Sequence, residues 1–261
     1  MLNLDQYAYL SNLSKQDSLE KLIFSLLTLI VCIWANEPVI SIIIMLIMGG
    51  ITVFRGGTSL KVFLKLLSIP SAFLLISVIA IGIDVTKNPE ALWGPMRVLN
   101  SYIGLSVVGL PVAVNLFFKA LGAVSCLYYL ILSTPIVDLL SALERLGVPS
   151  LLREMMGLIY RFIFVFIETA QEMHLAQRAR LGYTTLRGSY RSLGTLISNL
   201  LVQALRKSEA LYTALEARGY QGELRVLEDA EDRITKGYLG IIGTNLGLVF
   251  ITLGIRAMGR G

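Results

Sequence analysis

Hydrophobic residues in this chain are gathered into long runs near its two ends, and polar residues predominate in the stretch between them. Runs apolar enough to lie in a bilayer cover residues 22–35, 39–54, 66–83, 105–132 and 238–255. The first two are shorter than the roughly 20 residues that a spanning helix prefers, but flanking residues extend them and Asn36-Glu37-Pro38 separates them as a tight turn. The pattern therefore predicts an all-α integral membrane protein with about five transmembrane helices.

Two prolines bear on the shape of the later spans. Pro70 lies near the start of the third run, so we expect it in the first turn of that helix, where a missing N–H costs little. A short amphipathic stretch with Lys61 and Lys65 comes before it. The fourth run is long and contains Pro111 and Lys119, so we expect a tilted or kinked helix, or one whose first part is re-entrant. Lys119 is the intramembrane charge with a potential function.

The polar stretch between the apolar runs predicts a domain of its own. Of the 23 Lys and Arg residues 13 lie between 133 and 236, where 12 of the 18 acidic residues also lie. Such mixed charge is typical of a water-facing region and argues against a basic surface for nucleic acid. We therefore expect an N-terminal membrane domain (1–132), a cytoplasmic domain (133–236) and a C-terminal transmembrane helix (237–261).

The distribution of Lys and Arg also predicts the orientation in the membrane, because these residues concentrate in cytoplasmic loops. Arg55, Lys61 and Lys65 share one loop, and the region 133–236 falls on the same side by parity of the spans. The N-terminus and the central region are therefore expected in the cytoplasm. Five spans place the C-terminus outside, despite Arg256 and Arg260.

Composition excludes most enzyme classes. The chain is 55% hydrophobic and only 16% charged, it has a single histidine, His174, and it lacks the glycine-rich loop of a P-loop nucleotide site. Cys32 and Cys126 lie in apolar runs and are expected to pack as small hydrophobic residues. The eight methionines are scattered, and His174 reads as an exposed or pairing residue. We therefore expect no catalytic residues and no metal site in this chain.

Two long helices are predicted inside the polar region. The first runs from about 151 to 180 and is apolar on almost every face over 155–167, which suits a buried or interfacial helix because the stretch is short and contains Arg161. The second has apolar residues at i, i+3, i+4, i+7 spacing from Leu193 to Leu215, which form one stripe. We expect the two helices to bury their stripes against each other.

Both helices end in the same chemistry. Ala179-Arg180 closes the first, with Gly182 two residues beyond, and Ala217-Arg218-Gly219 closes the second, 38 residues later. A cation in the last turn of a helix also satisfies the macrodipole, which is the simpler explanation for one such end. Two matched ends favour paired contacts, since an arginine beside a small alanine can enter a partner's cleft and bind carboxylates through two hydrogen bonds. Such anchors suit a partner with two equivalent pockets, such as a dimer.

Short segments spread over nearly the whole chain carry a resemblance to a known family. They are Leu4-Asp5-Gln6-Tyr7-Ala8-Tyr9, Thr134-Pro135, Leu146-Gly147-Val148-Pro149, Tyr160-Arg161-Phe162-Ile163-Phe164, Ala176-Gln177-Arg178-Ala179-Arg180 and Glu216-Ala217-Arg218-Gly219-Tyr220. In order and spacing they resemble the transmembrane (T) component of energy-coupling factor transporters, the EcfT family, and its CbiQ branch of cobalt and nickel systems. The last two segments resemble the two Ala-Arg-Gly motifs of that family, and the first of these departs from it with Leu181 where glycine is frequent.

The resemblance implies partners and roles. In that family the T component couples two ABC-type ATPase subunits, which use the ATP, to a separate membrane protein (the S component) that binds the substrate. The contacts to the ATPases would come from Ala179, Arg180, Leu181, Ala217, Arg218 and Gly219. Contacts to the S component would come from Met155, Met156, Phe162 and Phe166. The S component would be CbiM-like and accompanied by a small CbiN-like subunit. This chain would lie in the lipid of the cell membrane and would bind no cofactor of its own.

The leading hypothesis is thus a non-catalytic coupling subunit of an ATP-driven uptake transporter for cobalt or nickel. One alternative is a coupling subunit of the same kind for a vitamin. Another is a permease with its own substrate path, which needs polar residues in several spans, whereas these spans offer little beyond Asn115 and Lys119. A membrane enzyme needs clustered carboxylates or histidines, and the acids of 223–232 read more simply as a solvated linker.

Overall fold

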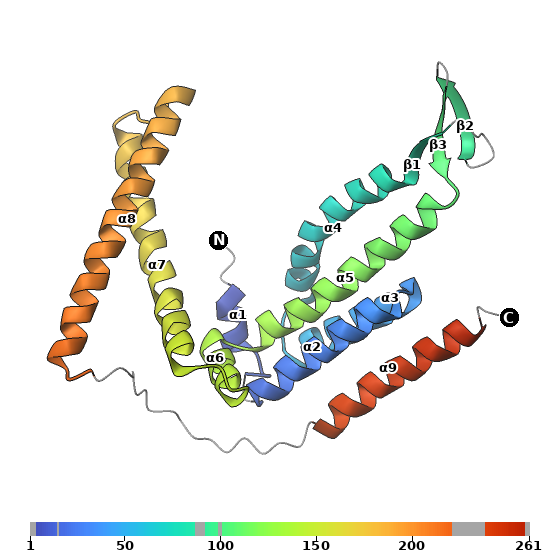
Figure 1. Ribbon diagram of the computed structural model, residues 1–261, viewed down its shortest axis with the longest axis horizontal. Helices are drawn as coiled ribbons and strands as arrows, with labels where there is room; N and C mark the ends of the chain where they lie inside the picture. Colours follow the sequence, from blue (N-terminus) through green and yellow to red (C-terminus); the bar gives the residue numbers. More distant parts are fainter. Residues whose placement is uncertain (1–3, 15, 87–91, 99–100, 221–237, 259–261) are drawn as a thin grey trace. The chain divides into compact units, whose positions relative to one another are not determined.

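The computed structural model describes residues 4–14, 16–86, 92–98, 101–220 and 238–258. The elements in chain order are α1 (Leu4–Leu10), α2 (Ser18–Ala35), α3 (Pro38–Gly50), the π-helical η1 (Ile51–Arg55), α4 (Leu60–Gly82), β1 (Ile83–Thr86), β2 (Leu92–Val98), β3 (Ser101–Ser106), α5 (Gly109–Ser133), α6 (Ile136–Arg145), α7 (Ser150–Ala179), α8 (Leu186–Ala217) and α9 (Tyr238–Met258) (Figure 1). They divide into two compact units, which we call the membrane unit (1–142 with 231–261) and the hairpin unit (143–230).

The membrane unit contains helices of the length and hydropathy of transmembrane segments. Four such spans are Ser18–Ala35, Pro38–Arg55, Leu60–Gly82 and Gly109–Ser133, which correspond to the first four apolar runs. Helix α9 lies beside α2 and is apolar over Gly240–Gly254. The prediction of a helical, multi-pass membrane protein is therefore confirmed, and the fifth span at α9 stays a prediction.

Helix α5 is the centre of the membrane unit and packs against α2, α3 and α4 (Figure 1). Gly122 permits a close approach to two helices, because a side-chain carbon there would lie 3.0 Å from Sγ of Cys32 on α2 and 3.0 Å from the carbonyl oxygen of Ser41 on α3. Small residues draw membrane helices together because association in lipid depends on close packing rather than on the exclusion of water. Cys32 and Cys126 are fully buried, as expected for small packing residues.

Buried polar side chains hydrogen-bond across the membrane unit. Lys21 is only 2% exposed, and its ammonium donates to the carbonyl oxygens of Leu13 (3.0 Å) and Ser133 (2.9 Å). Ser133 is the last residue of α5, so the cation meets a carbonyl that the helix itself leaves unpaired. The Thr28 hydroxyl bonds to Oδ1 of Asn245 at 3.2 Å and connects α2 to α9.

Lys119, the charge noted inside the fourth run, holds the turn between α2 and α3. Its ammonium donates to Oδ1 of Asn36 at 3.0 Å, and Nδ2 of Asn115 donates to the carbonyl oxygen of Asn36 at 3.0 Å. Asn36 ends α2 in the left-handed conformation with φ of 50°. These contacts give Lys119 and Asn115 a structural role at this turn.

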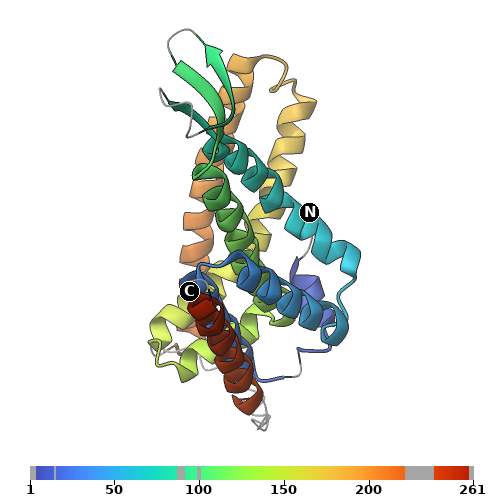
Figure 2. The ribbon, with the colours of Figure 1, turned by 90° about the vertical axis from the view of Figure 1, so that its right-hand side faces the viewer.

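Three strands that the apolar pattern did not predict join α4 to α5. They form an antiparallel sheet in the order β1-β3-β2, in which Ile83 of β1 pairs with Leu105 of β3. Figure 2 shows the sheet beyond the ends of α4 and α5. The predicted fourth run thus begins in a strand, and α5 starts at Gly109 with Pro111 in its first turn. The irregular start of this run is a strand and a turn, not a kinked or re-entrant helix.

The position predicted for Pro70 is wrong. Helix α4 begins at Leu60, so Pro70 lies in its interior and not in its first turn. The amphipathic stretch with Lys61 and Lys65 is the start of the same helix rather than a separate segment. Periodicity missed this because the two lysines interrupt the apolar run without ending the helix.

Candidate partner-binding site

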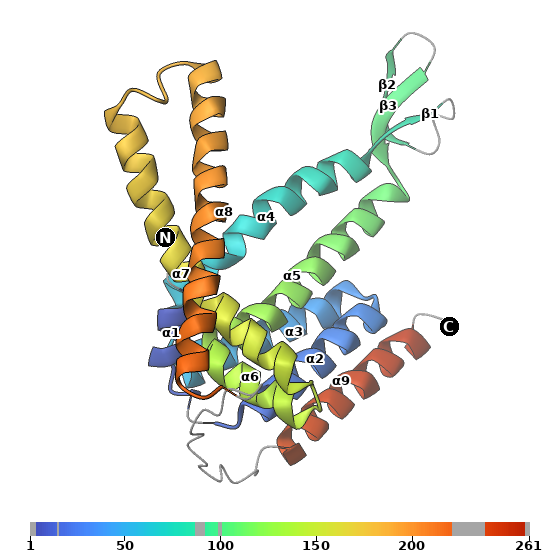
Figure 3. The same ribbon diagram turned by 60° about the vertical axis from the view of Figure 1, so that its left-hand side comes forward.

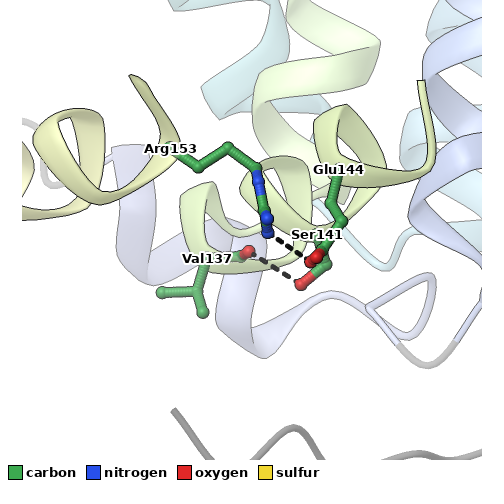
Figure 4. Close-up of polar contacts among 4 residues, drawn as sticks. All are labelled: Val137, Ser141, Glu144 and Arg153. Carbon is green, nitrogen blue, oxygen red and sulfur yellow. Dashed lines mark hydrogen bonds and ion pairs between the residues drawn. The ribbon is translucent and has the colours of Figure 1, made fainter. Parts of the chain in front are cut away.

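Helices α7 and α8 of the hairpin unit lie antiparallel and side by side (Figures 1 and 3). The start of α7 is fixed to the end of α6 by an ion pair between Arg153 and Glu144 (Figure 4). Within α6 the Ser141 hydroxyl donates to the carbonyl oxygen of Val137 at 3.4 Å, one turn back. The ion pair therefore connects the first turn of α7 to the last turn of α6.

The apolar stripe of α8 is only partly covered by α7. Leu196 is 8% exposed, whereas Ile197 and Leu201 are 59% and 62% exposed. Helix α7 has no fully buried residue. The prediction that the two stripes bury each other is therefore wrong in part. A stripe at i, i+3, i+4, i+7 spacing is wider than the seam between two helices, so one side of it stays open.

The first arginine end is closed by backbone hydrogen bonds. Arg180 is the C-cap residue of α7 with φ of −93° and ψ of 15°. The amide of Leu181 donates to the carbonyl of Arg178 (3.0 Å), and that of Gly182 donates to Gln177 (2.9 Å). This is a Schellman motif, whose residue after the cap must be left-handed, and Leu181 adopts φ of 60°. The leucine thus takes the conformation that a glycine usually supplies.

The second arginine end has the same geometry. Arg218 caps α8 with φ of −93° and ψ of 5°. The amides of Gly219 and Tyr220 donate to the carbonyls of Glu216 and Leu215, both at 3.0 Å, and Gly219 has φ of 76°. One turn earlier the Glu216 carboxylate accepts a hydrogen bond from the Tyr212 hydroxyl, which raises the pKa of Tyr212. The two ends are therefore equivalent in backbone as well as in sequence.

The arginine side chains at these ends are exposed and unpaired. Neither the guanidinium of Arg180 nor that of Arg218 has a hydrogen-bond or ion-pair partner among the residues that the structure describes. At each helix end the carbonyls two and three residues before the arginine are bonded to backbone amides, so the arginines are not needed as hydrogen-bond caps for these groups. This weakens the explanation by helix capping alone and leaves both groups available to a partner.

The two arginines lie at opposite ends of the hairpin. The Tyr220 hydroxyl donates to Oε2 of Glu154 at 3.3 Å, so the end of α8 lies beside the beginning of α7. Helix α8 has 32 residues, which corresponds to a length of roughly 48 Å at about 1.5 Å per residue. Any partner that engages both arginines must therefore present two sites a comparable distance apart. The sequence alone did not reveal this separation.

Three of the four apolar residues proposed as partner contacts lie together. Met155, Phe162 and Phe166 line a groove of about 220 Å³ between α7 and α8, with the phenyl rings of the two phenylalanines stacked at 5.8 Å. Ala204, Ser208 and Leu211 of α8 complete its far side. Met156, which is 36% exposed, does not line this groove. The structure thus brings together three of the four predicted contacts.

His174, for which exposure or pairing was predicted, is an exposed residue of α7 that packs its ring against that of Tyr183, with centroids 4.6 Å apart. Sequence reasoning missed the contacts of Tyr183 and Tyr220, of which that of Tyr220 with Glu154 connects residues far apart in the chain. Across the described ranges no group of three or more His, Cys, Asp or Glu residues lies close enough to hold a metal ion.

Comparison with known proteins identifies the family. A family model described as cobalt transport protein CbiQ matches residues 11–227, which include both arginine ends. This chain belongs to the CbiQ/EcfT family. It is the transmembrane T component of an energy-coupling factor transporter, and therefore a non-catalytic transporter subunit.

Relatives of this T component carry names from both branches of the family. It is 30% identical over 226 residues to the cobalt transport protein CbiQ of Salmonella typhimurium, covering 87% of this chain and 100% of that protein. It is 30% identical over 228 residues to the energy-coupling factor transporter transmembrane protein EcfT of Brevibacillus brevis, covering 81% and 82%. A fused cobalt transport protein CbiMQ of Methanocorpusculum labreanum is 29% identical over 226 residues, covering 87% of this chain and 38% of that protein.

Proposed function

We propose that this T component connects two ATPase subunits to a separate substrate-binding membrane subunit in an uptake transporter for cobalt or nickel ions. The observation that carries the proposal is the pair of equivalent helix ends, each with an exposed and unpaired arginine at the C-cap. The ATPases bind and hydrolyse the ATP, and this chain binds no cofactor. Its hairpin unit lies in the cytoplasm, where the ATPases have access to it.

The geometry of the hairpin suits a dimeric motor. Arg180 and Arg218 have the same backbone conformation, so each presents its guanidinium group to a pocket in the same way. A guanidinium group binds a carboxylate through two parallel hydrogen bonds, which fixes orientation as well as position. The two arginine ends, separated by about the length of α8, each engage the same pocket on one of the two ATPase subunits. Relative movement of the two ATPases then shifts the hairpin.

The apolar surface of the hairpin suits the substrate-binding subunit. Phe162 and Phe166 line the groove, and the open side of the α8 stripe exposes Ile197 and Leu201. Such a surface on a helical hairpin marks a site of protein contact. One relative is a fused CbiMQ protein, which supports a CbiM-like subunit as the partner. A small CbiN-like subunit is proposed as a further member from the sequence resemblance alone. Met156 lies outside the groove, and we propose that it contacts the substrate-binding subunit from the adjacent face of α7.

The substrate follows from relatives rather than from a site in this chain. Proteins named for cobalt transport support cobalt, with nickel as the second candidate. A permease path of its own is not favoured, because polar side chains in the spans such as Thr28, Asn115 and Lys119 bond to neighbouring helices or turns. Uptake of radiolabelled cobalt and nickel by the reconstituted full complex distinguishes the two metals from a vitamin substrate.

The assignment of the anchors is tested by charge reversal. The double variant Arg180→Glu/Arg218→Glu should fail to co-purify with the ATPase subunits while remaining in the membrane in normal amounts. The matched control is Arg187→Glu/Arg206→Glu, which makes the same change of charge at two other exposed arginines of α8. If the first variant retains the ATPases as well as the control does, the arginine ends are not the anchors and the proposed coupling role is refuted.

A further inference from the structure

A shallow cavity lies at the turn between α7 and α8, beside the first arginine end. Its volume is about 220 Å³. We call it the turn notch; its lining consists of Gln177, Arg180, Gly182, Arg191, Ser192 and Thr195. Both helices contribute to this lining, so the position of Arg191 beside the cavity follows from the turn and not from the pattern of either helix alone.

Hydrogen bonds and a close backbone contact fix the shape of the turn notch. The Ser192 hydroxyl donates to the carbonyl of Gly182 (2.8 Å), and Nε2 of Gln177 donates to the carbonyl of Ser192 (3.0 Å). The Tyr183 hydroxyl in turn donates to Oε1 of Gln177 at 2.7 Å. A side-chain carbon at Gly182 would lie 2.6 Å from the Ser192 hydroxyl oxygen and 3.0 Å from the backbone carbonyl oxygen of Gln177, so a larger residue there would disturb the hydrogen bond between Ser192 and Gly182. The notch is therefore a built feature of the turn.

The charges around the turn notch are unbalanced. Arg180 and Arg191 are both exposed, and neither guanidinium group has a hydrogen-bond or ion-pair partner in the described part of the chain. The lining includes no carboxylate. Two neighbouring cations repel each other, and an anion between them removes this repulsion while forming charge-assisted hydrogen bonds. Carboxylate oxygens match the planar donor geometry of guanidinium groups.

We propose that the turn notch receives an acidic side chain of one ATPase subunit, which Arg180 and Arg191 bind together. This inference rests on the proposed function, in which Arg180 contacts an ATPase, and it adds Arg191 as a second contact at that end only. At the other end, the charged residue nearest to Arg218 along the helix is the acid Glu216. The two ends therefore share a backbone geometry but differ in electrostatics, and the α7 end binds its ATPase more tightly.

The test compares Arg191→Gln with Arg187→Gln in the full chain reconstituted in lipid nanodiscs. Arg187 lies in the same turn region, is exposed and does not line the notch, so it controls for the loss of one positive charge. Titration with the purified ATPase subunits should show binding roughly tenfold weaker for Arg191→Gln and unchanged for Arg187→Gln, the loss expected for one charge-assisted hydrogen-bonded pair. Arg191→Lys should restore part of the affinity, because it restores the charge without the planar donors.

The outcomes separate this inference from the proposed function. If Arg180→Glu/Arg218→Glu abolishes ATPase binding while Arg191→Gln binds as the wild type does, the notch is not a contact and the coupling role stands. If the double variant still binds the ATPases, the proposed function fails and the notch proposal fails with it. Vesicles of phosphatidylglycerol are a second probe: weaker binding of Arg191→Gln to these vesicles, with ATPase binding unchanged, assigns the notch to lipid and overturns the proposal. Equal melting temperatures of Arg191→Gln and Arg187→Gln confirm that folding is intact.

Discussion

Replacing Leu181 by glycine should stabilise the end of α7. Leu181 adopts φ of 60°, and the left-handed conformation costs a residue with a side chain roughly 1–2 kcal/mol. Glycine has no such cost but loses more freedom on folding, about 0.5–1 kcal/mol. The leucine side chain is 71% exposed, so little buried surface is lost with it. The net gain is therefore about 0.7 kcal/mol, which corresponds to a three- to fourfold change in the local opening equilibrium.

Hydrogen–deuterium exchange measures this change directly. The amides of residues 181 and 182 close the Schellman motif, so peptides covering them should exchange about three times more slowly in Leu181→Gly than in the wild type. Leu201→Gly is the control, because Leu201 is similarly exposed but lies inside α8, where glycine costs about 1 kcal/mol. That variant should exchange faster around position 201 and no more slowly at 181. Unchanged or faster exchange at residues 181 and 182 in Leu181→Gly would refute the argument from backbone strain.

Three further predictions concern the membrane unit and the orientation. Lys21→Met should lower the free energy of unfolding by about 3 kcal/mol, because two buried carbonyls lose their hydrogen-bond donor. A decrease in melting temperature in detergent no larger than that of a surface lysine variant would contradict this. Gly122→Val should reduce the folded yield and melting temperature, because its side chain collides with Cys32, whereas Gly240→Val, where the space is open, should not. Glu209→Cys in the hairpin unit should react with an impermeant maleimide only after right-side-out vesicles are opened. Cys32 and Cys126 should not react, because both are buried. Labelling of intact vesicles would place the hairpin outside.

Apolar runs and helical periodicity were enough to predict most of the helices. The apolar runs correspond to α2, α3, α4 and α5 because a bilayer demands about 20 apolar residues regardless of tertiary contacts. The spacing from Leu193 to Leu215 likewise predicted α8. The three short strands were not predicted. The strands β1 to β3 lie in a stretch of mixed polarity between two spans, where neither a helical nor an alternating pattern is sustained.

The arginine ends could be predicted from sequence, but their arrangement could not. Residue type and spacing pointed to Arg180 and Arg218, because Ala-Arg followed by a left-handed residue is a local feature. The turn that reverses the chain between α7 and α8 is what separates these arginines, and the same turn brings Arg191 to the notch. Contacts between residues remote in sequence depend on packing, which a single sequence does not specify.

The backbone closure of both helix ends has a consequence for what a substitution at either arginine changes. Backbone amides close both helix ends, and among the described residues the side chains of Arg180 and Arg218 form no hydrogen bond to the ends that carry them. A substitution at either position therefore changes what the protein recognises without unravelling the helix. The two ends can therefore be altered independently. Under the proposed function, the same hairpin can then bind two different ATPase subunits as well as two identical ones.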